Sequence, residues 1–482
     1  MKKLLFFSFG LLLFSQCVID FPTYPIVSYD APHYKGASDF VTQTYQGGEF
    51  VINLPNTANR VADSLHYVQQ GLRLKEKCPC SDSLQLWGRV NLVPDNDVPP
   101  PPPRGNGDTG SIIRNYSVFS FSDTSFKFTS SNLPLNENID RFRYPTNPRQ
   151  TVVIGIDDTG INLSDQPTAA SPFLFSNNGT PPFICGSDWL REGIYGMNFV
   201  NLSARRNSQE SSEPLDMDGH GTFINGVLWG KAVLPNEASD ANYFGSSESV
   251  ALKFLHAKFV KDRQSPATLY DALCGVHYAL SKGAKVINTS WRALATGDPD
   301  TLQRAFKPTM RAVKDHYHAL LVASSGNDKM KLGQRYQHFG PISFPAAFSR
   351  DDEFGNNVIA VGAWNVSGAG SIPIFSNEDD YVDIYAPGVN ITSTFITNTE
   401  FPYGKSVGSG TSYAAPYIAR IAAILYGLHP EEESWANIKN LIIDRSDSRS
   451  PIVNPQQQIK LLNVPNIMAN HTTLRSRPIQ RQ

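Results

Sequence analysis

The sequence predicts an α/β fold: a doubly wound, mostly parallel sheet preceded by a small N-terminal α+β unit. Short apolar runs without polar alternation recur from residue 151 onward, as is typical of strands covered on both faces. Helical patterns lie between these runs, and strands that alternate with helices indicate a parallel sheet. At 482 residues, the chain has room for more than one domain.

The first segment has the pattern of an export signal. Two lysines precede an apolar run over residues 4–14, and small or polar residues follow it. We interpret residues 1–17 as a signal peptide. The stretch FSQC, ending at Cys17, resembles a bacterial lipobox, although Gln16 stands where a small residue is usual. Two outcomes stay open: acylation of Cys17 in the cell envelope, or removal of the signal nearby and release outside the cell.

Residues 18–98 are predicted to form the small α+β unit. Glu49–Leu54 alternates as a strand, Thr57–Leu72 carries apolar residues at helical spacing, and Leu84–Val93 is a second candidate strand. Five consecutive prolines, Pro99–Pro103, then indicate an extended, stiff linker. We treat residues 99–147 as linker and irregular segment and assign no element to them.

The cysteines fit an exported chain. Apart from Cys17 there are four, which permits disulfides and leaves their pairing open. Cys78 and Cys80 resemble half of a metal site, but no second cysteine pair or spaced histidines complete one. Cys274 lies within a helical pattern, and we interpret it as a small buried apolar group.

Residues 148–482 form the predicted main domain. Its candidate strands are Val152–Ile156, Val250–Leu255, Lys285–Ser290, Ala319–Ser325 and Val358–Ala363. The stretch Ala267–Gly283 has an apolar stripe at helical spacing and ends in glycine. Tyr413–Leu428 is apolar on all sides except at Arg420, which predicts a buried central helix.

Four polar residues lie at strand ends and helix starts, where catalytic and binding residues are commonly found in such folds. Asp158 follows the first strand, His220 lies between two glycines, Asn327 follows a strand and a glycine, and Ser412 begins the central helix. Each of them alone is compatible with an ordinary turn. Together they supply a nucleophile, a base, a carboxylate that orients the base and a donor for an oxyanion.

The residues of these stretches, and their order along the chain, resemble those of a known family. DTG, HGT, SGN and GTSYAAP resemble the signature blocks of subtilisin-like serine peptidases, over residues 148–466. The resemblance implies a subtilisin-like fold, a catalytic triad of Asp158, His220 and Ser412, and an oxyanion donor at Asn327. It also implies polypeptide substrates and an acyl-enzyme on Ser412.

Further expectations come from the same resemblance. The family lays its substrate as an extended strand beside a segment that corresponds to Ser290, Trp291 and Arg292, with Gly326 close by. A Leu-Gly pair is usual after that serine, and a bulky ring and a cation replace it here, so the sequence does not define the main specificity pocket. We expect Arg292, near the cleft, to favour acidic substrate residues. Calcium stabilises many members, yet we can assign no ligands. The N-terminal unit is similar to propeptides that assist folding and inhibit the enzyme.

Two other functions compete with this one. Paired DTG triplets occur in aspartic proteases, and Asp108 begins a second DTG, but it lies in the linker only 50 residues before Asp158. A catalytically inactive peptidase fold that binds partners at the cell surface is the other alternative. The formal net charge of -2 does not indicate nucleic acid or a membrane surface as a binding partner. Any contact with a membrane would come from a lipid on Cys17.

Overall fold

The structure is a computed structural model of the chain. It describes residues 45–54, 60–81, 83–89, 111–118, 129–130, 149–162, 189–191, 194–200, 214–235, 243, 247, 249–262, 267–295, 299–327, 342–367, 370–378, 381–396, 404–429, 435–450 and 458–469. All of these belong to one compact unit, Thr42–Gln482. The predicted signal peptide with Cys17, and the proline run, lie outside the described residues.

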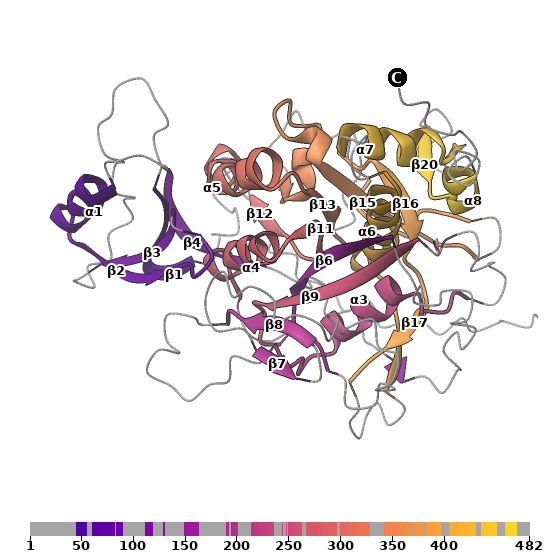
Figure 1. The fold of residues 1–482 in the computed structure, drawn as a ribbon, viewed down its shortest axis with the longest axis horizontal. Coiled ribbons are helices and arrows are strands. Elements are labelled where there is room, and N and C mark those ends of the chain that lie inside the picture. Colours follow the sequence, from indigo (N-terminus) through magenta and orange to yellow (C-terminus); the bar gives the residue numbers. More distant parts are fainter. Residues whose placement is uncertain are drawn as a thin grey trace, which may run out of the picture. The chain divides into compact units, whose positions relative to one another are not determined.

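A ten-stranded sheet forms the centre of this unit, in the order β19-β20-β16-β15-β13-β11-β6-β9-β8-β7 (Figure 1). Its strands are β6 (Gln150–Asp158), β7 (Trp189–Arg191), β8 (Ile194–Asn198), β9 (Val250–Lys258), β11 (Ala284–Thr289), β13 (Leu320–Ser324), β15 (Val358–Trp364), β16 (Ile384–Pro387), β19 (Asp447–Arg449) and β20 (Ile459–Leu461). Neighbours from β8 to β20 run parallel, and the outermost pair at each edge is antiparallel.

Helices cover both faces of this sheet. They are α3 (His220–Trp229), α4 (Leu269–Ser281), α5 (Pro299–Arg311), α6 (Thr411–Leu428), α7 (Trp435–Asp444) and α8 (Val464–Met468). Alternate residues of each strand point to opposite faces, so Leu320 and Val322 of β13 pack with α3 and α6, whereas Leu321 and Ala323 pack with α4 and α5. The predicted doubly wound, mostly parallel sheet is confirmed.

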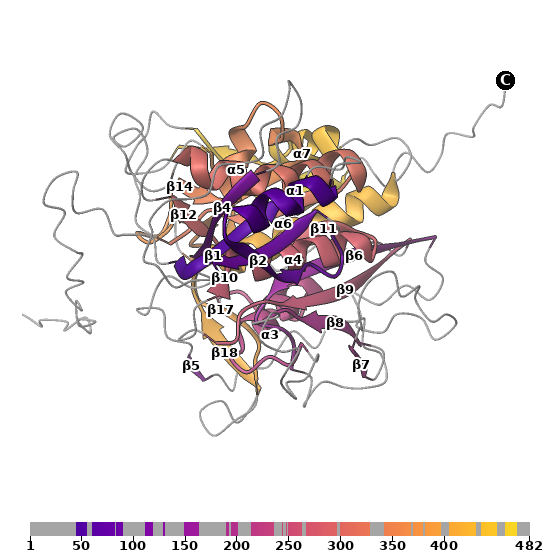
Figure 2. The ribbon, with the colours of Figure 1, turned by 90° about the vertical axis from the view of Figure 1, so that its left-hand side faces the viewer.

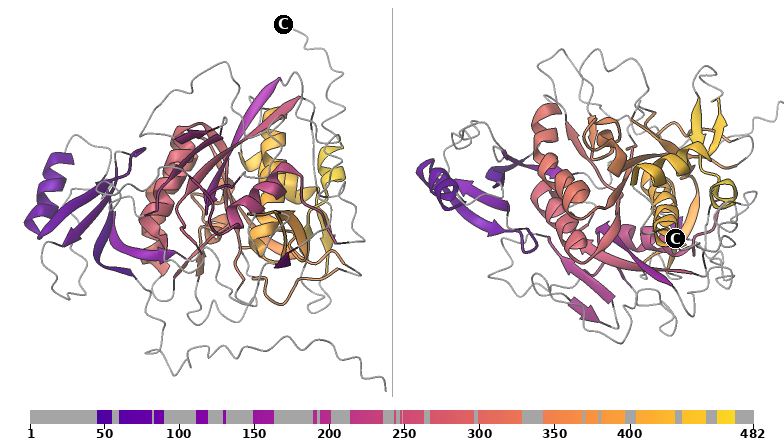
Figure 3. Two further views of the ribbon diagram at one scale, coloured as in Figure 1. Left: turned by 90° about the horizontal axis from the view of Figure 1, so that it is seen from below. Right: turned by 45° about the horizontal axis from the view of Figure 1, so that its top comes forward.

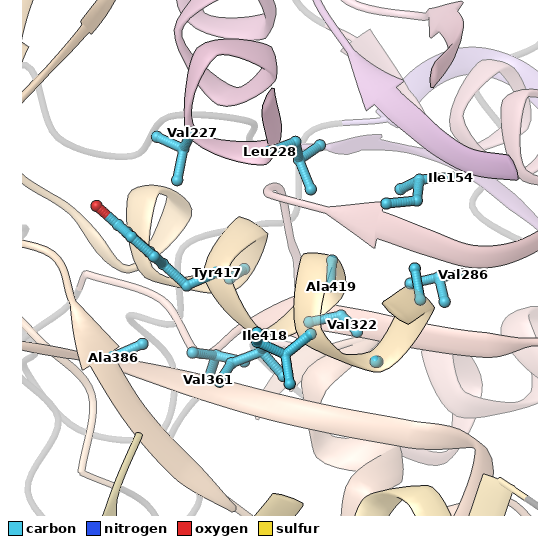
Figure 4. Packing of buried hydrophobic residues seen from close by; sticks show 14 of the residues in the cluster. Ile154, Val227, Leu228, Val286, Val322, Val361, Ala386, Tyr417, Ile418 and Ala419 are labelled. Carbon is cyan, nitrogen blue, oxygen red and sulfur yellow. The ribbon is translucent and has the colours of Figure 1, made fainter. Parts of the chain in front are cut away.

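Helix α6 is the buried central helix that the sequence predicts. Its side chains pack among sheet residues such as Val322 and Val361, with Val227 and Leu228 of α3 beside them (Figure 4). The one charge, Arg420, donates from Nη1 to the carbonyl oxygen of Leu228 at 2.7 Å, near the end of α3 where helical carbonyls lack partners. Among the described helices, none is both long and apolar enough to cross a bilayer.

The N-terminal unit is a second, antiparallel sheet with one helix, as expected. It contains β1 (Tyr45–Asn53), α1 (Arg60–Gln69), β2 (Leu72–Lys77), β3 (Leu84–Arg89) and β4 (Ser111–Val118), in the order β10-β4-β1-β3-β2 (Figure 2). Strand β4 lies in the stretch to which the sequence analysis assigns no element. It forms because it pairs with β1 on one side and with β10 (Ala267–Thr268) on the other.

This N-terminal sheet packs on the face of the main domain that carries α4 and α5 (Figure 3). Val51, Leu84 and Leu86 belong to the same buried cluster as the apolar residues of α4. The remaining short strands are β5 (Thr129–Ser130), which pairs with β18 (Lys405–Gly408), β17 (Ile391–Thr394), which also pairs with β18, and β12 (Ala293–Ala295), which pairs with β14 (Ile342–Phe344). Strand β18 ends four residues before Ser412.

Candidate active site

Asp158 and His220 meet where β6 ends and α3 begins. The Nδ1 atom of His220 lies 2.8 Å from Oδ1 of Asp158, and both side chains are 2% exposed. The backbone N–H of Thr159 also donates to that carboxylate oxygen, at 2.7 Å. A carboxylate in this position holds the imidazole in the tautomer that carries its proton on Nδ1, which leaves Nε2 to accept a proton.

Two glycines allow these two segments to approach each other. Gly160 has a φ of 106°, and a Cβ there would lie 2.1 Å from the carbonyl oxygen of Pro214. A Cβ on Gly221 would lie 2.2 Å from the carbonyl oxygen of Gly160. The hydroxyl of Thr159 accepts a hydrogen bond from the Gly221 N–H at 2.8 Å. The DTG and HGT stretches therefore pack directly against each other.

Asp216, which is not among the predicted site residues, holds the turn that leads into α3. It is fully buried, and its Oδ1 accepts from the N–H groups of Asp218 and Gly219 at 2.9 and 2.8 Å. Its Oδ2 accepts from the N–H and the hydroxyl of Thr222 at 2.9 and 2.7 Å. Asp216 thus satisfies donors at the start of the helix and fixes the backbone that carries His220. The acidic residues before HGT were the available signal.

Ser412 lies in the first turn of α6 and is held by Ser290. The Ser412 hydroxyl donates to the carbonyl oxygen of Ser290 at 3.1 Å, and the Ser290 hydroxyl donates to the carbonyl oxygen of Ser412 at 2.8 Å. The adjacent Tyr413 ring lies 5.6 Å, centroid to centroid, from the ring of His220 and 4.4 Å from Phe223. These contacts bring the start of α6 beside the Asp158–His220 pair.

Asn327 also contacts the start of α6. Its Oδ1 accepts hydrogen bonds from both the backbone N–H and the hydroxyl of Thr411, each at 2.9 Å. Because the oxygen is engaged in this way, the Nδ2 group is on the other side of the carboxamide and keeps its protons for another acceptor. The N–H of Gly326 donates to the Thr411 hydroxyl at 3.2 Å, and Gly326 has a φ of 105°.

Buried Asn377 holds the loop that carries Gly326 and Asn327 through two hydrogen bonds to its backbone. Its N–H donates to the carbonyl oxygen of Gly326 at 3.0 Å, and its Nδ2 donates to that of Ser325 at 2.8 Å. Asn377 is not among the residues predicted for the site, and it lies 50 residues after Asn327 in the chain. Such backbone contacts fix a loop without leaving a local pattern in the sequence.

Trp291 and Arg292 are both buried, with exposed fractions of 1% and 4%. The Trp291 ring stacks on Phe306 at 6.2 Å and contacts Phe259 at 5.3 Å, so it belongs to the core beneath α5. Its indole N–H donates to Oδ2 of Asp157 at 3.0 Å. Asp157, which precedes the candidate triad residue Asp158, is therefore hydrogen-bonded to Trp291, which follows Ser290.

We expect Asp157→Asn to stabilise the protein at neutral pH. Burial, and then the charge of neighbouring Asp158, raise the pKa of Asp157 well above its usual value. The folded protein keeps a proton that the unfolded chain releases above about pH 4, so this group lowers the free energy of unfolding as the pH rises. Asparagine stays neutral and keeps an oxygen for Trp291.

Thermal unfolding of Ser412→Ala protein with and without the Asp157→Asn substitution tests this prediction. The variant should unfold at the higher temperature at pH 8, and the difference should shrink toward pH 4. Asp315→Asn, at an exposed carboxylate, is the matched control and should leave the pH dependence unchanged. A difference that is the same at both pH values would show that Asp157 is ionised in the folded protein.

Within the described residues, no three His, Cys, Asp or Glu side chains gather as a metal ion would require, and calcium stays a prediction from the resemblance. Cys80 is disulfide-bonded, whereas Cys78 and Cys274 are free thiols. Cys185 lies outside the described residues. The buried position predicted for Cys274 agrees with its exposed fraction of 0%.

Comparison with known proteins identifies relatives of this chain. The chain is 32% identical over 213 residues to a thermophilic serine proteinase of Bacillus sp. strain AK1, covering 44% of each chain. It is 30% identical over 248 residues to the major intracellular serine protease of Bacillus subtilis, covering 52% of this chain and 66% of that protein. With subtilisin Savinase of Lederbergia lenta it shares 32% identity over 226 residues, covering 46% and 68% respectively.

The chain thus spans about half the length of the relatives it matches, from 44% to 68% in these three. Its fold is similar to that of fervidolysin from Fervidobacterium pennivorans, a keratinolytic enzyme related to subtilisin, with a TM-score of 0.54 and 15% identity over 88% of this chain and 61% of that one. The sequence profile of the Subtilase family matches residues 149–461, about two thirds of the chain. As the signature blocks indicated, the chain belongs to the subtilase family.

Proposed function

We propose that this protein is an exported serine endopeptidase that cuts peptide bonds through an acyl-enzyme on Ser412. The observation that carries the proposal is the buried hydrogen bond of 2.8 Å between Asp158 and His220, beside the start of α6. A serine hydroxyl is a poor nucleophile at neutral pH and needs a base in contact with it. An imidazole oriented by a carboxylate is such a base.

In the proposed reaction, Ser412 Oγ attacks the carbonyl carbon of the substrate while Nε2 of His220 takes the hydroxyl proton. The hydroxyl first rotates away from the carbonyl of Ser290, to which it donates in the structure. Asp158 stabilises the imidazolium, which then gives its proton to the leaving amine. Water releases the acyl group in a second step of the same kind.

The oxyanion of the tetrahedral intermediate needs donors that are already in place. We assign this role to Nδ2 of Asn327 and to the backbone N–H of Ser412 at the N-terminus of α6. Two hydrogen bonds from Thr411 fix the orientation of the Asn327 carboxamide, which supports the assignment. The N-terminal end of a helix also favours negative charge.

Ser290, Trp291, Arg292 and Gly326 remain our proposed substrate-binding segment. Trp291 would act there through its backbone, since its ring is buried against Phe306. For Arg292, the proposal is a preference for acidic substrate residues. Peptide-library profiling of Arg292→Gly would test it, and an unchanged profile would remove Arg292 from specificity.

We propose that the N-terminal unit is an intramolecular inhibitor of the peptidase. Its sheet continues into β10 of the main domain, and its apolar face packs on α4. The chain then returns to the main domain at β5, which pairs with the strand that leads to Ser412. Full-length protein should be latent and gain activity as the connection between the two parts is cut.

A serine-directed covalent inhibitor gives the direct test of this function. In the mature protein, a fluorophosphonate should label Ser412 and stop casein hydrolysis, whereas a pepstatin-type inhibitor should have no effect. Labelling at Ser412 without hydrolysis of casein or a peptide library would favour the inactive binding protein. N-terminal mass spectrometry of the same sample would report export processing and whether Cys17 carries a lipid.

A further inference from the structure

A buried lysine lies beside the candidate triad. Lys258 is the last residue of β9 and is 5% exposed. Its Nζ donates to the carbonyl oxygen of Thr159 at 2.7 Å and to that of Lys261 at 3.3 Å. Lysine side chains are seldom buried, because taking the ammonium group out of water costs free energy that its partners must offset. Packing alone would favour an apolar side chain at this position.

Lys258 and Asp158 are neighbours on adjacent strands. Strands β6 and β9 are parallel, and Asp158 is the register partner of Lys258. Neighbouring strands lie about 5 Å apart and register partners point to the same face of the sheet, so the lysine side chain starts beside the aspartate side chain. The N–H of Phe259, the next residue, donates to the carbonyl oxygen of Asp158 at 3.0 Å. The Lys258 side chain extends this pairing to the carbonyl of Thr159.

Thr159 links the lysine to both members of the candidate pair. Its N–H donates to Oδ1 of Asp158 at 2.7 Å, and its hydroxyl accepts from the N–H of Gly221, the residue after His220, at 2.8 Å. Its carbonyl oxygen accepts from the ammonium group. Gly160 follows with a φ of 106°, and a glycine lets the peptide group before it adopt several orientations. The ammonium group therefore fixes the orientation of a peptide group that adjoins the pair.

We propose that Lys258 is a positioning residue for the proposed peptidase reaction. It acts through Thr159, which it holds in the orientation that lets Asp158 and His220 form their hydrogen bond. Its positive charge also opposes protonation of the imidazole, so His220 stays available as a base at lower pH. The kinetic part of this inference rests on the proposed function, whereas the effect on the hydrogen bond can be observed without catalysis.

Four carboxylates oppose the effect of burial on Lys258. Burial lowers the pKa of its ammonium group, and the carboxylates raise it. They come from the turn before α3, from β6 and from the segment after β9: Asp216, Asp218, Asp158 and Asp262. Burial lowers the pKa of His256, on the same face of β9, to about 3, so this imidazole is neutral at neutral pH. From α6, the ring of Tyr413 faces His220. Loss of the lysine charge therefore makes the surroundings of His220 more negative.

The first experiment needs no catalysis. Proton NMR of full-length Ser412→Ala protein follows the Nδ1 proton of His220, whose signal lies far downfield because of its hydrogen bond to Asp158. Loss of the signal in His220→Ala assigns it. In Lys258→Met we expect the signal to broaden or disappear, because a loosened hydrogen bond exchanges its proton with water more often. A signal of unchanged position and width in folded Lys258→Met would overturn the positioning role.

Lys285→Met is the matched control for this experiment. Lys285 also donates from Nζ to a backbone carbonyl oxygen, that of Tyr317 at 2.8 Å. It lies at the start of β11, whereas Lys258 ends its strand, so the two lysines are at opposite ends of the parallel sheet. The control should leave the downfield signal unchanged, and Lys258→Arg, which keeps charge and donors, should retain it. Lys258→Gln, uncharged and one bond shorter, replaces Lys258→Met if circular dichroism shows that variant unfolded.

Kinetics test the same residue in the active, mature protein. Lys258→Met should lower kcat on a peptide substrate by about 10- to 100-fold with little change in KM, because it disturbs the reacting groups and not substrate binding. The acid limb of the kcat/KM profile should move to higher pH, because the imidazolium is favoured once the cation is gone. Lys258→Arg should restore both. A lower kcat with an unmoved acid limb would refute the role of the charge.

The two measurements separate this inference from the proposed function. Casein hydrolysis by the wild type, with kinetics and a downfield signal that Lys258→Met does not alter, would refute the role of Lys258 and leave the peptidase proposal standing. A signal that depends on Lys258, in a protein that hydrolyses neither casein nor a peptide library, would support the link from Lys258 to the pair and refute the peptidase proposal.

Discussion

Ser412→Ala is expected to lower kcat on the order of a million-fold, the scale established for removal of the serine from a subtilisin triad. The substitution removes the only nucleophile in the proposed reaction and leaves Asp158 and His220 in place. It deletes one hydroxyl, whose hydrogen bond goes to the carbonyl oxygen of Ser290. Initial rates with casein and with a chromogenic peptide measure the loss.

Ser409→Ala is the matched control for this prediction. Ser409 lies three residues before Ser412, between β18 and α6, and its hydroxyl accepts a hydrogen bond from the N–H of Asn390. The control should keep activity close to that of the wild type. Circular dichroism and thermal unfolding should show both variants folded. Appreciable turnover by folded Ser412→Ala would place the nucleophile elsewhere.

Asn327→Ala is expected to lower kcat by about 100- to 1,000-fold, the range for one oxyanion donor. The loss should fall on kcat with little change in KM, because the interaction strengthens only as negative charge develops on the substrate oxygen. Steady-state kinetics on a peptide substrate separate these two constants. Equal kcat values for variant and wild type would reject the assignment.

Asn327→Asp distinguishes donation from a purely structural role. Aspartate keeps an oxygen for the N–H and hydroxyl of Thr411, which the structure places 2.9 Å from Oδ1, but it has no N–H to donate. We therefore expect it to lose at least as much kcat as alanine does. If aspartate restored activity, the role of Asn327 would be to hold the start of α6.

The parts of the site that the sequence predicted are those with a local pattern. Asp158 ends an apolar strand, and Ser412 lies in the first turn of a helix that is apolar on all sides except at Arg420; both positions follow from residues next to them. The same holds for the central sheet, whose strands read as short apolar runs because both faces are covered.

The remaining features depend on contacts between distant residues. The role of Asp216 follows from its four hydrogen bonds, two to the turn before α3 and two to Thr222 in the first turn of α3. Strand β4 has partners in β1 and β10, and its own sequence lacks a clear alternation. The inward direction of Trp291 is set by Asp157, 134 residues earlier in the chain. A single sequence does not reveal such pairings.

The parallel sheet also has a consequence for how this chain folds. Its site joins residues that are far apart, such as Ser290 and Ser412, which are separated by 122 positions. Closing such long loops precedes any gain from the contacts they bring, so a topology of this kind has a high contact order and folds slowly. Strands β1 to β4 precede α4 in the chain, so the apolar surface against which α4 packs is synthesised before that helix.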